Sequence, residues 1–182
     1  MARHRDPDVE GRILNAAHRL WHKGGEDALN LRAVAKAART NTPAVYRRFK
    51  NREDILRALV QSFQAELLRK LEGCGSMRQV VDCALDFALS QPREYELINS
   101  GLLGRVTKSR PSVEFVILKS AEWLGGSPSQ NRNLVSALWF MIHGFVMLRI
   151  SSTMPEEHFP QALTTFHKSI DILVKNRGEL KD

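Results

Sequence analysis

The amino-acid sequence predicts an all-α fold made of two helical domains. Apolar residues recur at helical spacing along almost the whole chain, and no segment carries the alternating pattern of a half-buried strand. Glycines and prolines interrupt the apolar stretches and mark the ends of the expected helices. With 182 residues, 43% of them hydrophobic and 26% charged, the chain has the length of one domain or two small ones and the composition of a folded protein.

The first two predicted helices open the chain. One face of the first helix is apolar at positions i, i+3, i+4, i+7 and i+8, which are Ile13, Ala16, Ala17, Leu20 and Trp21. The pair Gly24–Gly25 is expected to end this helix. Asn30 is a suitable N-cap for a short second helix over Leu31–Ala38, because its side chain can accept a hydrogen bond from a free backbone N–H.

A third and a fourth helix follow at once. Asn41 is the expected N-cap of a helix over Thr42–Phe49, in which Pro43 falls in the first turn, where a backbone N–H is not needed. Asn51 is the next cap, and it opens a long helix that reaches about Glu72.

Five more helices are expected in the rest of the chain, with prolines and glycines between them. Their approximate ranges are 77–90, 93–103, 112–124, 130–152 and 156–176. The fold class is therefore an N-terminal three-helix domain with a C-terminal helical domain, and we expect the boundary between residues 57 and 58.

The positive charge is concentrated in the N-terminal domain. The formal net charge is +7; residues 1–57 hold 13 Lys and Arg against 7 Asp and Glu, and residues 58–182 hold 14 against 13. A uniformly basic protein would not divide in this way. The asymmetry favours a polyanion-binding end over 1–57 and a nearly neutral end over 58–182.

The cysteine and hydropathy patterns disfavour disulfide-rich, zinc-binding and membrane-spanning proteins. Cys74 and Cys83 are too few for a disulfide framework or a four-ligand zinc site. A disulfide between them and two unpaired thiols both fit, and the second fits a reducing cytoplasm better.

The most apolar stretch, Leu134–Leu148, has 15 residues, whereas a membrane span needs about 20. We expect a buried helix there, a cytoplasmic protein and no membrane partner.

The helices 31–38 and 42–49 form a helix-turn-helix candidate, with the motif at about 30–49. In such a unit the second helix enters the DNA major groove and the first supports it. Hydrogen-bond donors and cations line the second helix and the residues after it, namely Asn41, Thr42, Tyr46, Arg47, Arg48, Lys50 and Arg52. The alternative is an ordinary helical hairpin with a solvated basic face.

The segment Arg12–Leu59 resembles the DNA-binding domain of TetR-family transcriptional regulators. That domain opens with the pattern I-L-x-A-A-x-x-L-F followed by glycine, and residues 13–21 here read I-L-N-A-A-H-R-L-W. It continues to Y-x-x-F-x-x-K, and residues 46–52 read Y-R-R-F-K-N-R before the acidic and apolar residues E-D-I-L at 53–56. The resemblance implies a DNA-binding transcriptional regulator.

The turn departs from the family pattern at two positions. It usually reads A-G-V-S, and residues 38–41 here read A-R-T-N. Arg39 stands where glycine normally takes a left-handed conformation, at a cost of about 1 kcal/mol for a residue with a side chain. Thr40 replaces a small apolar residue. We expect the fold to survive both changes with a strained or rebuilt turn.

The resemblance also implies DNA contacts, residue by residue. Phosphates would be held by Tyr46, Arg48, Arg52, Arg32 and the backbone of Leu31. Base edges would be faced by Thr42, Pro43, Ala44 and Arg47. Pro43 and Ala44 offer only apolar contact, for instance to thymine methyl groups, whereas Arg47 can read guanine through two hydrogen bonds.

The neutral domain carries a second, shorter resemblance. Residues 139–144, W-F-M-I-H-G, are similar to the W-x-x-x-H-G signature of one subgroup of TetR-type C-terminal domains, and residues 92–97 to its P-x-x-Y-x-L segment. The expected pocket for a small, mostly apolar effector is lined by Phe87, Tyr95, Trp123, Trp139, Phe140, His143 and Met147. Ordinary core packing is the alternative for each of them. His143 has no second ligand at helical spacing, so neither a metal nor a cofactor is implied.

The last two long helices complete the predicted assembly. The stripe of Phe159, Ala162, Leu163, Phe166, Ile170, Leu173 and Val174, with the helix around 134–150, could form half of a four-helix bundle in a homodimer, or could be internal core. The resemblance implies the dimer, a palindromic operator and a repressor that an effector releases. An enzyme is disfavoured, because no nucleophile–base pair or paired carboxylates stand at local spacing. An architectural nucleic-acid protein would lack a ligand-sized cavity.

Overall fold

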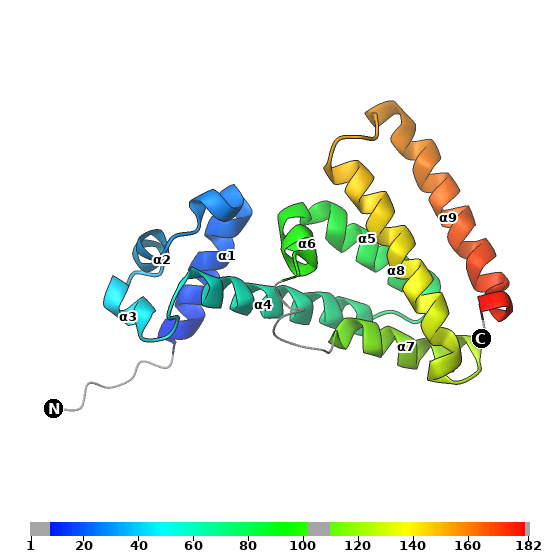
Figure 1. Cartoon of the computed structure of the whole chain (residues 1–182), viewed down its shortest axis with the longest axis horizontal. Coiled ribbons are helices and arrows are strands. Elements are labelled where there is room, and N and C mark those ends of the chain that lie inside the picture. Colours follow the sequence, from blue (N-terminus) through cyan, green and yellow to red (C-terminus); the bar gives the residue numbers. More distant parts are fainter. Residues whose placement is uncertain (1–7, 102–109, 181–182) are drawn as a thin grey trace. The chain divides into compact units, whose positions relative to one another are not determined.

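The computed structural model describes residues 8–101 and 110–180, and this part of the chain is helical without any strand (Figure 1). The predicted all-α class is confirmed. The helices are α1 (Val9–Ala28), α2 (Leu31–Ala37), α3 (Thr42–Tyr46), α4 (Arg52–Glu72), α5 (Met77–Ser90), α6 (Pro92–Asn99), α7 (Pro111–Leu124), α8 (Pro128–Ile150) and α9 (Phe159–Lys175), with 3-10 turns η1 (Glu156–His158) and η2 (Arg177–Leu180).

Contacts between Cα atoms divide the chain into two compact units. The first comprises Met1–Phe63 and Arg93–Lys108, and the second comprises Gln64–Pro92 and Ser109–Asp182. Helix α4 therefore contributes residues to both units. Most of α6 belongs to the first unit, although the helices before and after it belong to the second.

The first unit packs α1, α2, α3 and the start of α4 around a small apolar core. The side chains of Ile13, Val34, Val45 and Ile55 are each at most 1% exposed. Helix α1 contacts α2, and α2 contacts α3. Burial of these side chains stabilises the unit by roughly 1.5–3 kcal/mol for each large apolar residue.

The glycine pair Gly24–Gly25 interrupts the helix where the sequence predicted its end, and a short further turn follows the break. Gly24 and Gly25 have non-helical backbone angles, and Gly25 has a φ of 57°, which glycine adopts without strain. One further turn follows the bend and extends to Ala28. The Arg52 side chain donates hydrogen bonds to this extra turn, as described below.

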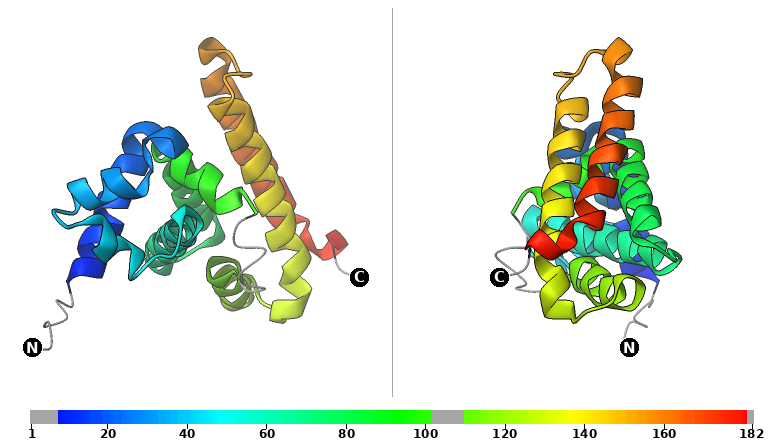
Figure 2. Two further views of the ribbon diagram at one scale, coloured as in Figure 1. Left: turned by 60° about the vertical axis from the view of Figure 1, so that its left-hand side comes forward. Right: turned by 90° about the vertical axis from the view of Figure 1, so that its right-hand side faces the viewer.

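The second unit is built around α8. Helices α5, α7 and α9 all contact it, and α8 and α9 lie side by side as an antiparallel pair (Figure 2). The side chains of Leu134, Leu138, Ile142 and Val146 recur along one face of α8 and are each at most 7% exposed. This spacing gives α8 a buried stripe that faces the other helices of the unit.

Helix α8 is also the helix, within the described residues, that is long and apolar enough to span a membrane. It has 23 residues with a mean hydropathy of 1.5 in its most apolar window, of which 33% is buried. Length and composition are weak evidence for a span, and the contacts of α8 with α5, α7 and α9 are those of a helix inside a folded unit.

The remaining helices begin and end close to the predicted residues, with two differences. Helix α6 ends at Asn99, ahead of the expected residue 103, where Ser100 N–H turns back to the Leu97 carbonyl and Gly101 takes a φ of 80°. The last predicted helix opens as the 3-10 turn η1, and α9 begins at Phe159.

Candidate nucleic-acid interface and ligand cavity

The three asparagine caps predicted from the sequence are present. The Asn30 side chain accepts a hydrogen bond from the Ala33 N–H at 2.8 Å, and Asn41 accepts one from Ala44 N–H at 2.9 Å. Asn51 does the same for Asp54 N–H at 2.9 Å. Each cap satisfies a backbone donor that the first turn of a helix leaves free, so the starts of α2, α3 and α4 are fixed locally.

The turn between α2 and α3 has the strain predicted for it. Arg39 has a φ of 52°, the left-handed region in which a side chain costs free energy. Thr40 N–H donates to the Ala35 carbonyl at 3.0 Å and Arg39 N–H to the Lys36 carbonyl at 3.2 Å, which closes the end of α2. The family-like turn therefore forms without its glycine.

One side of α3 is part of the core. Val45 is fully buried, Phe49 is 6% exposed and Ala44 is 5% exposed. Ala44 was expected to face base edges, and the structure places it inward instead. Helix α3 itself ends at Tyr46, three residues before the predicted end, and Phe49 follows as part of a turn whose N–H still reaches the Val45 carbonyl.

The other side of α3 is exposed and basic. Tyr46 is 52% exposed although it is a large ring. Arg47, Lys50, Asn41 and Pro43 are also exposed, and so is Arg32 in the first turn of α2, whereas Thr42 and Leu31 are half-buried. We call the set Arg32, Asn41, Thr42, Pro43, Tyr46, Arg47 and Lys50 the α3 face. It combines cations, hydrogen-bond donors and one aromatic ring.

Arg48 and Arg52, both predicted to contact phosphates, have partners within the first unit. The Arg52 guanidinium donates to the carbonyls of Leu29 at 2.9 Å and Glu26 at 2.7 Å, and to the Glu26 carboxylate at 2.8 Å. The Arg48 side chain is 19% exposed and its Nε lies 3.8 Å from the Glu10 carboxylate. Arg52 fastens the start of α4 to the last turn of α1, which periodicity alone does not reveal.

Helix α6 is attached to α1 by contacts that the sequence did not predict. Trp21 Nε1 donates to the Arg93 carbonyl at 3.2 Å, and Arg93 donates to the His22 carbonyl at 2.7 Å. Glu94, only 1% exposed, has Oε1 3.0 Å from His22 Nδ1 and 3.9 Å from His18 Nε2. The signal in the sequence was the pair of histidines four residues apart, but their partner lies far along the chain.

The second unit contains an apolar cavity of about 90 Å³ between α4, α5, α7 and α8. Its lining is aliphatic apart from one indole ring and one hydroxyl, and consists of Leu67, Leu71, Met77, Val80, Val81, Ala84, Ser112, Val113, Val116, Val135, Leu138, Trp139 and Ile142. It can bind an uncharged apolar group, because it offers no charged partner.

Only one of the predicted effector contacts, Trp139, lines this cavity. Phe87 is fully buried, and Tyr95, 6% exposed, belongs to the first unit. Phe140 is 63% exposed. Trp123 and Met147 are half-buried on α7 and α8.

The Trp139 ring contacts the side chains of Phe140, His143 and Arg110. The His143 ring stacks on it with centroids 5.4 Å apart, and the Arg110 guanidinium lies 5.3 Å from its centroid. Trp139 and His143 are four residues apart on α8, so they share a face of the helix and their rings can stack. The assignment to the W-x-x-x-H-G subgroup stays a prediction.

Apolar side chains are exposed along one stripe of α8 and on α9. Phe140 and Leu148 are 63% and 48% exposed, and Gly144 lies midway between them with open space where a Cβ would be. Ile172 of α9 is 62% exposed. Large apolar side chains left in water at helical spacing are typical of a surface that another helix covers.

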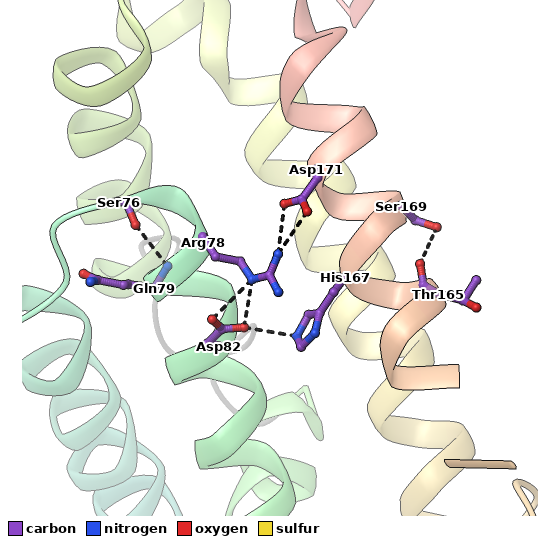
Figure 3. Close-up of polar contacts among 8 residues, drawn as sticks. All are labelled: Ser76, Arg78, Gln79, Asp82, Thr165, His167, Ser169 and Asp171. Carbon is purple, nitrogen blue, oxygen red and sulfur yellow. Dashed lines mark hydrogen bonds and ion pairs between the residues drawn. The ribbon is translucent and has the colours of Figure 1, made fainter. Parts of the chain in front are cut away.

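Charged residues fix α9 onto α5 (Figure 3). The Arg78 guanidinium donates to both carboxylate oxygens of Asp171 at 3.0 and 3.1 Å, and also to Asp82 at 3.3 Å. His167 Nε2 lies 3.1 Å from Asp82 Oδ1. The hydrogen bond to Asp171 raises the pKa of Arg78 above its ordinary value. Arg78 therefore stays charged and links the two helices.

Comparison with known proteins gives a family match for the N-terminal part of the chain. Residues 13–59 match the family model described as "Bacterial regulatory proteins, tetR family". No curated protein sequence matches the chain.

The described residues contain no group of three or more His, Cys, Asp or Glu placed to hold a metal ion.

Three solved structures illustrate the likeness of fold. A variant TetR from Acinetobacter baumannii AYE in complex with minocycline has 20% identity and a TM-score of 0.68, covering 95% of this chain and 98% of that one. The regulator SCO7222, a TetR from Streptomyces coelicolor, has 17% identity, a TM-score of 0.70 and coverage of 94% and 98%. The multidrug binding protein EbrR, complexed with imidazole, has 20% identity, a TM-score of 0.53 and coverage of 88% and 96%.

Proposed function

The chain belongs to the TetR family of bacterial regulatory proteins, and we propose that it is a dimeric repressor released from its operator by a small apolar molecule. As a member of this family it is a DNA-binding transcriptional regulator. The observation that carries the proposal is the exposed basic α3 face, which lies inside the segment that matches the family model. We expect it to act in the bacterial cytoplasm.

The proposed operator contacts follow from exposure. Tyr46, Arg32 and Lys50 would hold phosphates, together with the backbone N–H of Leu31 in the first turn of α2. Arg47 would read guanine, and Pro43 with the Thr42 methyl group would contact thymine. Asn41 is exposed at the start of α3 and would contact the backbone. Ala44, Arg48 and Arg52 would support this face from within the unit.

The proposed effector site is the cavity beside Trp139. Its volume of about 90 Å³ is smaller than the roughly 300–1,000 Å³ of typical drug-sized sites. It is also smaller than an engineered apolar cavity of about 150 Å³ that binds benzene, so an effector of one ring or more would require the lining side chains to move. The presence of a cavity favours a sensor over an architectural protein, and two of the similar solved structures are complexes with small molecules, minocycline and imidazole.

The proposed dimer uses the exposed stripe of α8 with α9. Phe140, Gly144 and Leu148 are spaced four residues apart, so they share one face, and the glycine permits close approach of a second helix. A two-fold dimer would present two α3 faces to DNA and would match a palindromic operator. We place the functional boundary between the DNA-binding and the effector domains near residue 57.

Selection of bound DNA tests the function directly. The full chain would be incubated with a random duplex library, and bound duplexes would be amplified and sequenced. We expect enrichment of a near-palindrome with half-sites about one helical turn or more apart. Arg47→Ala should abolish the enrichment, and Arg132→Ala is its control, because Arg132 is also an exposed arginine but belongs to the second unit. A library that stays random with the wild-type chain would refute sequence-specific binding.

A further inference from the structure

Glu94 of α6 is a buried carboxylate with few partners for its charge. Its side chain is 1% exposed, and burial of an ionised group is unfavourable unless a positive charge or hydrogen bonds compensate for it. Oε1 lies 3.0 Å from His22 Nδ1 and 3.9 Å from His18 Nε2, whereas Oε2 has no hydrogen-bond partner among the described residues. A neutral imidazole can donate one hydrogen bond but brings no positive charge. The charge state of the two histidines therefore decides whether the carboxylate is neutralised.

The ion pairs of Glu94 involve histidines alone within the part of the chain that the structure describes. Both histidines come from α1, where a spacing of four residues places them on one face. From α4, the uncharged Phe63 ring meets the His18 ring edge-on, with the ring centroids 4.8 Å apart. Arg93, the neighbour of Glu94 on α6, donates instead to the His22 carbonyl at 2.7 Å. The positive charge that pairs with Glu94 therefore depends on protonation of His18 and His22.

We propose that Glu94, His18 and His22 form a proton-sensitive contact that holds α6 against α1 more firmly at mildly acidic pH than at alkaline pH. Histidine is the side chain that ordinarily gains its charge between about pH 8 and pH 5. A charged His22 turns its hydrogen bond to Oε1 into a charge-assisted one, and a charged His18 adds a second attraction. As the pH rises, loss of these protons leaves a neutral hydrogen bond beside a buried charge. The contact therefore weakens with rising pH through this range, and it weakens again in strong acid once Glu94 itself is protonated.

The position of α6 in the chain gives this contact a consequence for regulation. Helix α6 belongs mostly to the first unit, whereas α5 before it and α7 after it belong to the second. Helix α1 also packs against α2, the first helix of the helix-turn-helix. Release of α6 would act on the same helix that supports the DNA-binding motif, so operator affinity would change with pH. This consequence rests on the proposed function, whereas the pH dependence of the contact between α1 and α6 does not.

Hydrogen–deuterium exchange of the full chain at about pH 6 and about pH 8 tests the inference. Amide protection in peptides from α1 and α6, corrected for the intrinsic exchange rate at each pH, reports how often these helices open. We expect the protection to be about three- to tenfold higher at the lower pH in the wild-type protein, because a hydrogen bond to a charged group is stronger than a neutral one. Glu94→Gln keeps an accepting oxygen but has no charge, and it should lose this difference.

Two further variants make the test specific. His22→Gln replaces a side chain that is 65% exposed, so the chain should fold, and this variant too should lose most of the difference. His167→Gln is the matched control, because His167 also lies beside a carboxylate, that of Asp82, but belongs to the second unit. It should retain the wild-type response of α1 and α6.

Either of two outcomes would overturn the inference. One is the same pH response in the wild type, Glu94→Gln and His22→Gln, and the other is greater protection at the higher pH, which would mean that neutral histidines hold α6. If Glu94→Gln fails to fold, His22→Gln decides the same question. The assay contains no DNA, so its result is independent of the repressor proposal. Conversely, a pH-sensitive contact in a chain without operator affinity would retain this inference and refute the proposed function.

Discussion

The basic residues around α3 fall into two groups, according to whether their side chains are exposed or bound within the first unit. Arg47 is exposed and faces away from the core, whereas the Arg52 guanidinium makes three hydrogen bonds to the end of α1. Charge counts treat these residues alike. Their surroundings predict that one contributes to DNA binding and the other to folding.

The pair Arg47→Ala and Arg52→Ala separates these tasks. We expect Arg47→Ala to weaken operator binding by about 1–3 kcal/mol and to leave the unfolding temperature unchanged. Arg52→Ala should lower the unfolding temperature, because the carbonyls of Leu29 and Glu26 lose a charged donor. Fluorescence anisotropy and thermal unfolding measure the two effects. An Arg52→Ala protein as stable as wild type would contradict the role of Arg52 as a fastening between helices.

The conformation of Arg39 makes a prediction about stability. Its φ of 52° costs about 1 kcal/mol that glycine would not pay, and its side chain is exposed. We expect Arg39→Gly to raise the free energy of unfolding by about 0.5–1 kcal/mol, after the greater freedom of glycine in the unfolded chain is counted. Urea unfolding followed by circular dichroism gives the value. A loss of stability would show that the Arg39 side chain makes an offsetting contact.

Among the helices, the short ones depend most on their caps. Helix α2 has seven residues, too few to be stable alone, and the Asn30 side chain satisfies one of its free N–H groups. Asn30→Ala should destabilise the first unit by about 1 kcal/mol, whereas Asn30→Asp, which keeps the accepting oxygen, should not. Chemical denaturation of the three proteins compares them. Equal losses in both variants would argue against capping.

Local patterns predicted the helices better than they predicted the sites. Asn30, Asn41 and Asn51 reveal helix starts because a cap acts over three residues. The extra turn of α1 after Gly25 and the partner of Arg52 depend on packing between distant segments, which spacing cannot reveal. The same reason separates Trp139, which lines the cavity, from its neighbour Phe140, which does not line it and is 63% exposed.

At the level of the whole molecule, assembly is the first property to test. Phe140 belongs to the exposed stripe of α8, so Phe140→Asp would place a charge in the proposed interface. We expect the dimer to weaken at least about tenfold in dissociation constant, as measured by analytical ultracentrifugation. Leu118→Asp is the matched control, since Leu118 of α7 is 56% exposed outside this stripe. Equal effects of both changes would remove the stripe from the interface.

The salt dependence of operator binding tests the central claim, that two α3 faces of one dimer bind DNA through the basic N-terminal third of the chain. If each subunit neutralises about four phosphates, the logarithm of the association constant should fall against the logarithm of salt concentration with a slope of about −7. The slope should become shallower in Arg32→Ala and remain unchanged in Arg132→Ala. A slope of about −1 for the wild-type protein would contradict the account.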